Sequence, residues 1–167
     1  MIGQTSAVSR WRGREPVALA ARWILGCVFV YLGLSKALHP VDFLKLLRQY
    51  EIVESHLFLN FIATVLPWFE VLCGAFLLAG IAVRGSAFMS LVMLVPFSFL
   101  VLQRALAIHE ANAIPFCAIR FDCGCGIGEV AICYKLLENS LLIVLAVLLL
   151  TVRADRWCLR YAFVRSN

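Results

Sequence analysis

The stretch GSAFMSLVMLVPFSFLVL, residues 85–102, contains no charged residue and decides the fold class. A helix needs about 20 mostly apolar residues to cross the roughly 30 Å hydrocarbon core of a bilayer. This stretch is close to that length and is the cleanest of four such stretches in the chain. We therefore predict that it spans a membrane.

Three more apolar segments approach the length of a membrane span. They cover residues 17–37, 57–83 and 139–152. Arg22 interrupts the first near its start, Glu70 lies inside the second, and the last is short unless the turn 136–138 is added to it. Together the four segments predict an all-α protein, an integral membrane four-helix bundle.

The composition agrees with this prediction and excludes several classes of protein. Of the 167 residues, 63% are hydrophobic and 15% are charged, and the mean hydropathy is +0.92. Soluble domains average about 45–50% apolar and about 25% charged residues. A cytosolic enzyme, a disordered chain and a nucleic-acid binder are therefore excluded. The basic residues that give the net charge of +5 lie where the topology of a membrane protein requires them. The lipid bilayer is therefore the expected partner, and nucleic acid is not.

The basic residues predict the orientation of the bundle, because cytoplasmic loops carry an excess of Lys and Arg. Nine of the 15 Lys and Arg residues lie in or beside the two tails, residues 1–16 and 153–167, or at the turn before residue 85, and six lie on the opposite face. We expect two cytoplasmic tails around one membrane domain, residues 17–152, in a bacterial cytoplasmic (inner) membrane. The first helix should remain uncleaved, because its small residues precede the apolar run.

Two loops are then expected on the outer face. The first, residues 39–56, has apolar residues such as Phe43 and Leu47 at helical spacing with charged residues between them. Such an amphipathic segment either lies in the membrane interface or packs as a lid on the end of the bundle. The second loop, residues 107–135, holds four of the seven cysteines.

The cysteines of the second loop are Cys117, Cys123, Cys125 and Cys133. They can pair in three ways, among which sequence cannot choose. A Cys123–Cys125 bridge would close a very small ring with the torsional freedom of Gly124, and strained, exposed disulfides are the ones that accept electrons. Cys117 and Cys133 would then support that pair. The alternatives are two structural disulfides or a zinc site; because Cys-x-Cys is tighter than the usual zinc spacing, no metal is predicted.

The other three cysteines are expected to be inert. Cys27 and Cys73 lie in the first two spans, where cysteine usually behaves as a small buried hydrophobic residue. Cys158 lies in the C-terminal tail and should be reduced if that tail is cytoplasmic.

Glu70 indicates a polar site inside the bilayer, because a carboxylate at mid-bilayer costs about 2.5–3.5 kcal/mol and should be protonated or paired. Lys36 and Arg104, both near the outer ends of their helices, are its candidate partners. Glu138 and Asn139, at the start of the fourth span, are placed to line the same pocket. Such a site is either a structural clamp between helices or a proton path or polar pocket near the outer surface.

Three groups of residues carry a resemblance to a known family. They are Gly33-Leu34-Ser35-Lys36, Pro67-Trp68-Phe69-Glu70 with the following Gly74 and Gly80, and Cys123-Gly124-Cys125 before the last apolar helix. In this order, over about residues 17–152, they resemble the MauE/DoxX family of membrane proteins. MauE is the methylamine-utilisation member of that family.

The resemblance implies thiol–disulfide chemistry outside the cytoplasmic membrane. MauE-like proteins are associated with a thioredoxin-like partner that helps to mature a disulfide-rich extracytoplasmic dehydrogenase subunit. Carried over to this chain, Cys123 and Cys125 would be the exchanging pair, and Lys36 and Glu70 would be the polar family positions.

Three functions follow as hypotheses. The first is a membrane thiol–disulfide redox protein that uses Cys123 and Cys125, with electrons passing to Cys117 or Cys133, or to a quinone held near Glu70. Quinone is the one cofactor candidate, and the partner would be a thioredoxin-like or disulfide-rich extracytoplasmic protein. The second is a non-catalytic accessory subunit of a larger membrane redox or respiratory complex. The third, a small transporter or channel, is favoured only by Glu70.

Overall fold

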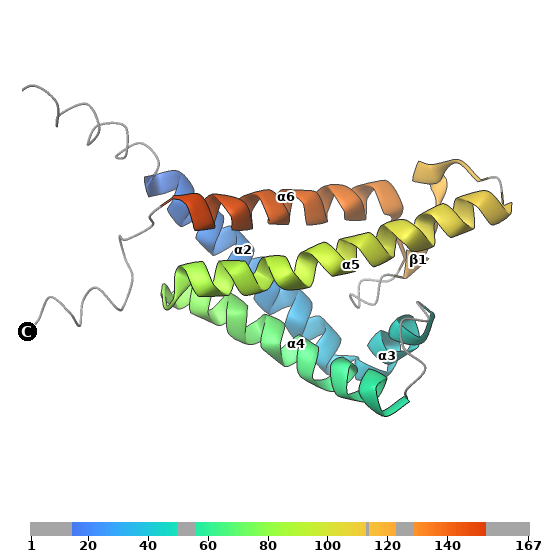
Figure 1. Cartoon of the computed structure of the whole chain (residues 1–167), viewed down its shortest axis with the longest axis horizontal. Helices are drawn as coiled ribbons and strands as arrows, with labels where there is room; N and C mark the ends of the chain where they lie inside the picture. Colours follow the sequence, from blue (N-terminus) through green and yellow to red (C-terminus); the bar gives the residue numbers. More distant parts are fainter. Residues whose placement is uncertain (1–14, 50–55, 113, 123–128, 153–167) are drawn as a thin grey trace, which may run out of the picture.

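The computed structural model describes residues 15–49, 56–112, 114–122 and 129–152. Four long helices run along the molecule (Figure 1): α2 (Glu15–Leu38), α4 (His56–Ala79), α5 (Val83–Asn112) and α6 (Ile132–Thr151). Each is long and apolar enough to cross a membrane. The prediction of an all-α membrane bundle with four spans is confirmed.

The four helices alternate in direction, so the bundle has two different ends. At the termini end α2 begins and α6 ends, and at the loop end lie the connections α2–α4 and α5–α6 (Figure 1). Helices that follow each other in sequence pack together, and α2 also packs on α6, which closes the bundle. The termini half of the interior is filled by buried apolar residues, which include Ala18, Leu25, Phe29, Leu77, Leu142, Ala146 and Leu149.

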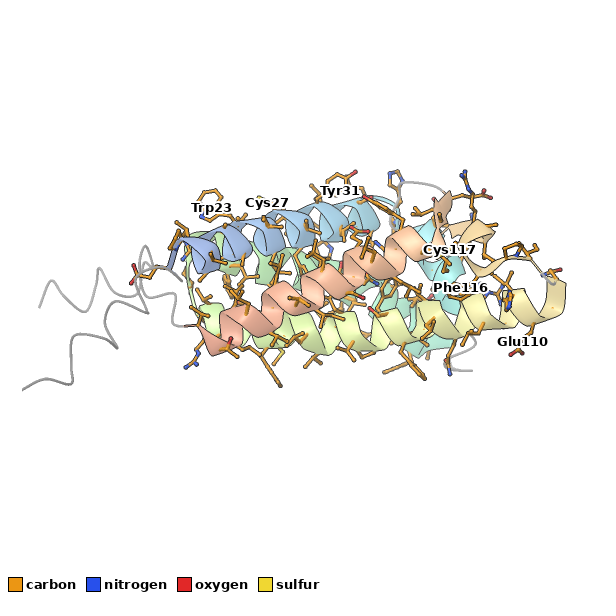
Figure 2. All side chains as sticks on the ribbon, turned by 90° about the horizontal axis from the view of Figure 1, so that it is seen from above. Trp23, Cys27, Tyr31, Glu110, Phe116 and Cys117 are labelled. Carbon is orange, nitrogen blue, oxygen red and sulfur yellow. A yellow bond between two sulfur atoms is a disulfide. The ribbon has the colours of Figure 1, made fainter. Side chains whose placement is uncertain are left out.

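The outward-facing surface of the bundle is mostly apolar, as a lipid-facing surface must be. Exposed side chains include Phe61, Phe76, Phe88, Phe99 and Leu141. On α2, Trp23, Cys27 and Tyr31 follow one another along the outward face of the helix (Figure 2). The expectation that Cys27 is buried is therefore wrong, because its position one turn from two exposed aromatic residues puts it on the same outward stripe. Cys73 is buried, as expected.

Helices α2 and α4 pack closely because three glycines remove side chains from their interface. A Cβ atom at Gly33 would lie 2.8 Å from the carbonyl oxygen of Pro67, and one at Gly74 would lie 2.8 Å from the carbonyl oxygen of Gly26. Small residues allow this approach in membrane helices, where close van der Waals packing drives association. The glycines thus bring the backbones together just beside Glu70, whose own Cβ would be 2.9 Å from a Cβ at Gly33.

Two helices extend further toward the loop end than their apolar segments indicate. Helix α5 continues to Asn112, well beyond residue 102, and α6 begins at Ile132 instead of residue 139. The added turns carry polar residues, which hydropathy alone cannot assign to a helix. Arg22, which is counted with the basic residues beside the N-terminal tail, is 2% exposed inside α2.

The amphipathic segment of the first loop forms α3 (Pro40–Gln49) and packs against the start of α4. Phe43 is 1% exposed and Leu47 is 7% exposed. Both contact a cluster that includes Leu59 and Ala63 of α4. The structure therefore shows the packing that the lid alternative predicts for this segment.

The connection between α5 and α6 folds back on the end of α5. It contains the short helix η1 (Phe116–Ala118) and two antiparallel strands, β1 (Arg120–Asp122) and β2 (Glu129–Ala131), in which Asp122 pairs with Glu129. Ile119 and Ile132 are buried against Val101 and Ala105 of α5. These contacts fix both ends of the hairpin to the bundle.

Candidate functional site

The centre of the candidate site is an ion pair between α2 and α4. Lys36 Nζ donates to both carboxylate oxygens of Glu70, at 2.7 Å to Oε1 and 2.9 Å to Oε2. The two side chains are only 5% and 12% exposed. Of the two partners expected for Glu70, the structure pairs it with Lys36.

The position of this ion pair follows from the lengths of the two helices. Lys36 lies in the last turn of α2. Glu70 lies 14 residues after His56, about 21 Å along α4 at 1.5 Å per residue. Helix α4 therefore extends past the end of α2 toward the loop end, and α3 packs on this extension. Glu70 is thus an interior residue of its helix and not a residue of its first turns.

Two aromatic rings complete the surroundings of the Lys36 ammonium group. Its Nζ lies 5.5 Å from the ring centroid of Phe43 on α3 and 5.3 Å from that of Phe97 on α5. Cations within about 6 Å of an aromatic centroid are attracted by the ring, more strongly where water is excluded. Lys36 is therefore held by groups from three other helices, which stabilises its charge in an apolar environment.

A cavity lies beside the ion pair, between all four long helices. Its lining residues are Phe29, Leu32, Lys36, Glu70, Met93, Leu94, Phe97, Lys135 and Asn139. The cavity has a volume of about 20 Å³, which is enough for one or two water molecules. Asn139, predicted to line a pocket with Glu70, does so.

A second ion pair approaches the same cavity from α6. Lys135 Nζ donates to Glu138 Oε2 at 3.0 Å, and the two side chains are 4% and 29% exposed. Glu138 is not among the residues that line the cavity, but its partner Lys135 is. Sequence reasoning places Lys135 in the outer loop and so misses it; the spacing of Lys135, Glu138 and Asn139, three and four residues apart, would have placed them on one helix face.

Arg104 does not join this group. It is exposed on α5, seven residues beyond the cavity-lining Phe97 and in the part of the helix that extends toward the loop end. The expectation that it belongs to the polar site with Glu70 is corrected, because the extra length of α5 carries it about 10 Å further along the helix axis.

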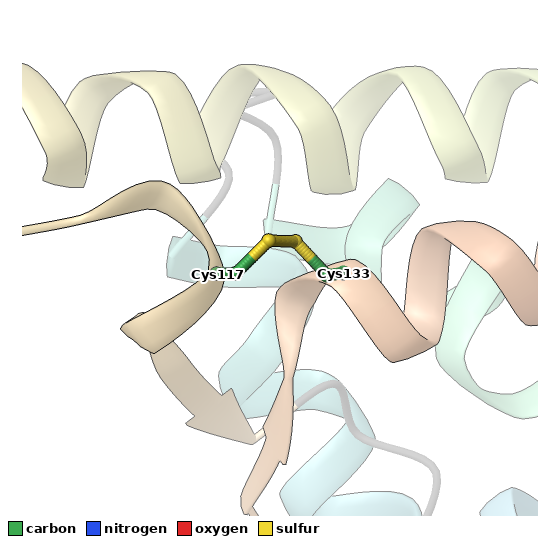
Figure 3. Close-up of a disulfide and its surroundings, with 2 residues drawn as sticks. All are labelled: Cys117 and Cys133. Atoms are coloured by element: carbon green, nitrogen blue, oxygen red, sulfur yellow. A yellow bond between two sulfur atoms is a disulfide. The ribbon is translucent and has the colours of Figure 1, made fainter.

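The cysteine loop contains a disulfide between Cys117 and Cys133 (Figure 3). It joins η1 to the first turn of α6, and the two Cα atoms are 5.2 Å apart. Cys133 packs with the apolar cluster around Val101 and Ile132. Of the three pairings open to the four loop cysteines, this disulfide is compatible with only one, in which Cys123 pairs with Cys125.

Cys123 and Cys125 themselves lie outside the described residues, in the segment 123–128. The ends of that segment are nevertheless fixed, because Asp122 and Glu129 pair across the hairpin. In the ranges that the structure describes, no group of three or more His, Cys, Asp or Glu side chains is placed to hold a metal ion.

The chain was also compared with known proteins. The family model of the methylamine utilisation protein MauE matches residues 14–152, which includes the four spans, the ion pairs and the cysteine loop. No curated protein and no solved structure matches the chain. The match covers most of the chain and names MauE, whereas the wider likeness to DoxX remains an expectation. The chain therefore belongs to the MauE family of multi-pass membrane proteins involved in methylamine utilisation.

Proposed function

We propose that this protein is a membrane thiol–disulfide redox protein that oxidises cysteines of an extracytoplasmic partner through Cys123 and Cys125. The observation that carries the proposal is the Cys117–Cys133 disulfide. It leaves Cys123 and Cys125 as the remaining pair of the loop. It also favours an oxidising compartment for the loop end, because disulfides rarely persist in the cytoplasm.

The two pairs of cysteines differ in their surroundings, which supports different roles for them. Cys117 and Cys133 tie η1 to α6 beside buried apolar residues, as a structural disulfide does. Cys123 and Cys125 are separated by Gly124 alone and follow directly on strand β1. A disulfide between such near neighbours is strained and therefore more oxidising than a relaxed one.

The exchange would proceed in two balanced steps. A thiolate of the partner attacks one sulfur of the Cys123–Cys125 disulfide, which forms a mixed disulfide and releases the other cysteine of the pair as a thiolate. A second thiolate of the partner then attacks the mixed disulfide. The partner leaves with a new disulfide, and two electrons remain on this protein as the reduced Cys123 and Cys125.

A thioredoxin-like or disulfide-rich extracytoplasmic protein is the partner class we propose, and a quinone is the proposed acceptor of the two electrons. The cavity beside Glu70 has room for one or two water molecules, which is too little for a quinone ring. The proposal therefore does not place the quinone next to Glu70, and the reduced Cys123 and Cys125 meet their oxidant at the loop end.

Thiol trapping in native membranes tests the proposal. We expect the Cys123–Cys125 pair to titrate near about −200 mV, as thiol-exchange catalysts do, and Cys117–Cys133 to resist reduction to below about −300 mV. Either Cys123→Ser or Cys125→Ser should abolish oxidation of the partner, because neither variant keeps the disulfide that the partner thiolate attacks, whereas the control Cys27→Ser should not. Partner oxidation that continues in the Cys123→Ser/Cys125→Ser double variant would contradict the proposal.

The second candidate is a non-catalytic accessory subunit of a larger membrane complex. The observation in its favour is that the described soluble part is limited to α3, η1 and a hairpin with three-residue strands, which is little surface for an independent catalyst. This alternative expects both cysteine pairs to resist reduction. It also expects purification in fixed stoichiometry with the complex, regardless of the Cys123→Ser substitution.

A further inference from the structure

Four polar side chains converge on the cavity in the loop half of the bundle, independently of the cysteines. Lys36 and Glu70 reach it from α2 and α4, and Lys135 and Asn139 reach it from α6. All four residues are buried, with 9% or less of their surface exposed. The cavity thus brings together two oppositely charged groups that already pair, a second cation with its own partner, and a neutral amide.

The amide of Asn139 is the group that points to a ligand. Asn139 is 2% exposed, and its Nδ2 has no hydrogen-bond partner among the described residues. Leaving such a donor unpaired in a buried site is unfavourable, because nothing compensates for the hydrogen bonds to water that it has lost. A water molecule satisfies it where the site has polar partners and room for at least one water, and the cavity meets both conditions with about 20 Å³.

We propose that this cavity is a hydration site, in which one or two water molecules accept from Asn139 Nδ2 and connect the Lys36–Glu70 pair to Lys135. The bound waters make the two ion pairs one hydrogen-bonded network that joins α2, α4 and α6. Through this network the Lys36–Glu70 pair exchanges its protons with solvent.

Among the residues that the structure describes, the polar groups beside the cavity lead toward the loop end of the bundle. Toward the loop end, Lys135 donates to Glu138, whose side chain is 29% exposed and so reaches water. Toward the termini end, the buried apolar side chains of the core lie beyond the cavity, among them Leu25, Leu77 and Leu142. Protons thus reach Glu70 by way of Lys135 and Glu138, from the same end that carries the cysteine loop.

A purely structural clamp would not need these groups. Replacing a buried ion pair with apolar residues of similar volume is often neutral or stabilising, and ionisable groups inside membrane helices characteristically mark ion or proton pathways. A dry clamp would also leave the Asn139 amide unpaired. Water in the cavity accounts for the amide, the space and the second ion pair together.

Infrared spectroscopy of the full-length protein in lipid nanodiscs tests the hydration site. The carboxylate bands of Glu70 are assigned by difference with Glu70→Gln, and the protein is then moved from H₂O to D₂O. These bands shift when the Lys36 N–H groups that donate to Glu70 become N–D. We expect the shift to be complete at the first measurement in the wild type and at least tenfold slower in Asn139→Leu, which removes the donor and fills the cavity.

Three further variants keep the test decisive. Ser140→Leu changes the neighbouring exposed residue of the same helix and should exchange as the wild type does. Asn139→Ala, which keeps room for water if Asn139→Leu fails to fold, should also exchange rapidly. Glu138→Leu should slow the exchange. A wild-type band that does not shift over hours, or unchanged exchange in Asn139→Leu or Glu138→Leu, would overturn the proposal.

Discussion

At the scale of single residues, Lys36 and Glu70 are the clearest case of two buried charges that stabilise each other. Each is nearly excluded from solvent, and each of the two carboxylate oxygens accepts from the ammonium group. Removing one partner of a buried pair costs about 3–5 kcal/mol, because the other charge is left buried and unpaired. The pair as a whole contributes far less, since desolvation of two ions offsets their attraction.

We therefore predict strongly non-additive effects of substitution at this pair. Lys36→Met and Glu70→Leu should each lower the free energy of unfolding in detergent micelles by about 3–5 kcal/mol. The double variant should lose much less than the sum of the two, because no charge is left unpaired. The measurement is a double-mutant cycle by chemical or thermal unfolding.

The exposed pair Lys45–Asp42 on α3 provides the matched control. Its Nζ–Oδ1 distance is 3.1 Å, but the side chains are 69% and 57% exposed. Exposed pairs typically contribute less than about 1 kcal/mol, so Lys45→Met and Asp42→Leu should have small, nearly additive effects. If the Lys36 and Glu70 variants behave in the same additive way, the buried pair is not coupled as the structure describes.

The sequence reaches some of these residues and not others, for physical reasons. A charge within an apolar run is conspicuous, so Glu70 and its candidate partner Lys36 are found directly. Lys135 is missed because it precedes the apolar part of α6 and reads as loop. Arg104 is assigned to the site because a helix that ends before residue 107 would have left it near the outer end of the bundle, whereas α5 continues past it to Asn112.

At the scale of elements, the α2–α4 interface depends on glycines that leave no room for a side chain. We predict that Gly33→Ala destabilises the protein by about 1–3 kcal/mol, as overpacking does, because the added Cβ would lie 2.8 Å from a backbone oxygen that cannot move aside alone. The same substitution should force α2 and α4 apart next to Lys36 and Glu70. Thermal unfolding measures the first effect, and the infrared bands of Glu70 report the second.

Gly85→Ala is the control for this prediction. Gly85 lies in the first turn of α5, and a Cβ there would meet only the Cβ of Ala82, at 4.0 Å. Replacing Gly by Ala in a helix without a steric conflict is favourable by about 0.5–1 kcal/mol. The two Gly→Ala substitutions should therefore have opposite signs, and equal effects would contradict the close packing at Gly33.

In the turn between α4 and α5, two substitutions should change the stability of the protein in opposite directions. Gly80, with φ 71°, ends α4: its N–H donates to Leu77 O at 3.2 Å, and Ile81 N–H donates to Phe76 O at 2.9 Å, the paired bonds of a Schellman motif. Ala82 is also left-handed, with φ 46°, which costs a residue with a Cβ about 1–2 kcal/mol. Ala82→Gly should raise the unfolding midpoint and Gly80→Ala should lower it, each by an amount that corresponds to about 1 kcal/mol. A lower midpoint in Ala82→Gly would show that this backbone strain is absent.

The extent to which sequence predicts these elements depends on what forms them. The four spans are determined by apolar length, which is visible along the chain. The polar ends of α5 and α6 form because Phe116 and Ile119 of the connecting segment pack on them, against Val101 and Ile132, a contact between distant residues. The three-residue strands of that hairpin are too short to have a detectable alternation.

At the scale of the whole molecule, the loop end gathers α3, the hairpin, the Cys117–Cys133 disulfide and the partly exposed Glu138. The termini end has the helix turn at Gly80, where Arg84 donates to the carbonyl oxygen of Leu150 at 2.8 Å and so caps the last turn of α6. The pairing of the cysteines was not predictable, because four cysteines allow three pairings and only the folded connection brings Cys117 next to Cys133.

This division between the ends makes the orientation in the membrane a sharp prediction. Nine of the 15 Lys and Arg residues lie in or beside the two tails or at the turn between α4 and α5, so the positive-inside rule predicts that this end faces the cytoplasm. We expect a reporter that is active only in the cytoplasm to be active when fused after Asn167, and a reporter that requires export to be inactive there.

The orientation predicted from charge also predicts the redox state of Cys117 and Cys133, because such a disulfide persists outside the cytoplasm and rarely within it. Alkylation of intact cells should therefore find this disulfide formed in the wild type. Adding Arg or Lys residues to the loop end until the topology inverts should leave both cysteines reduced, and a disulfide that still forms after inversion would show that its stability does not depend on the compartment.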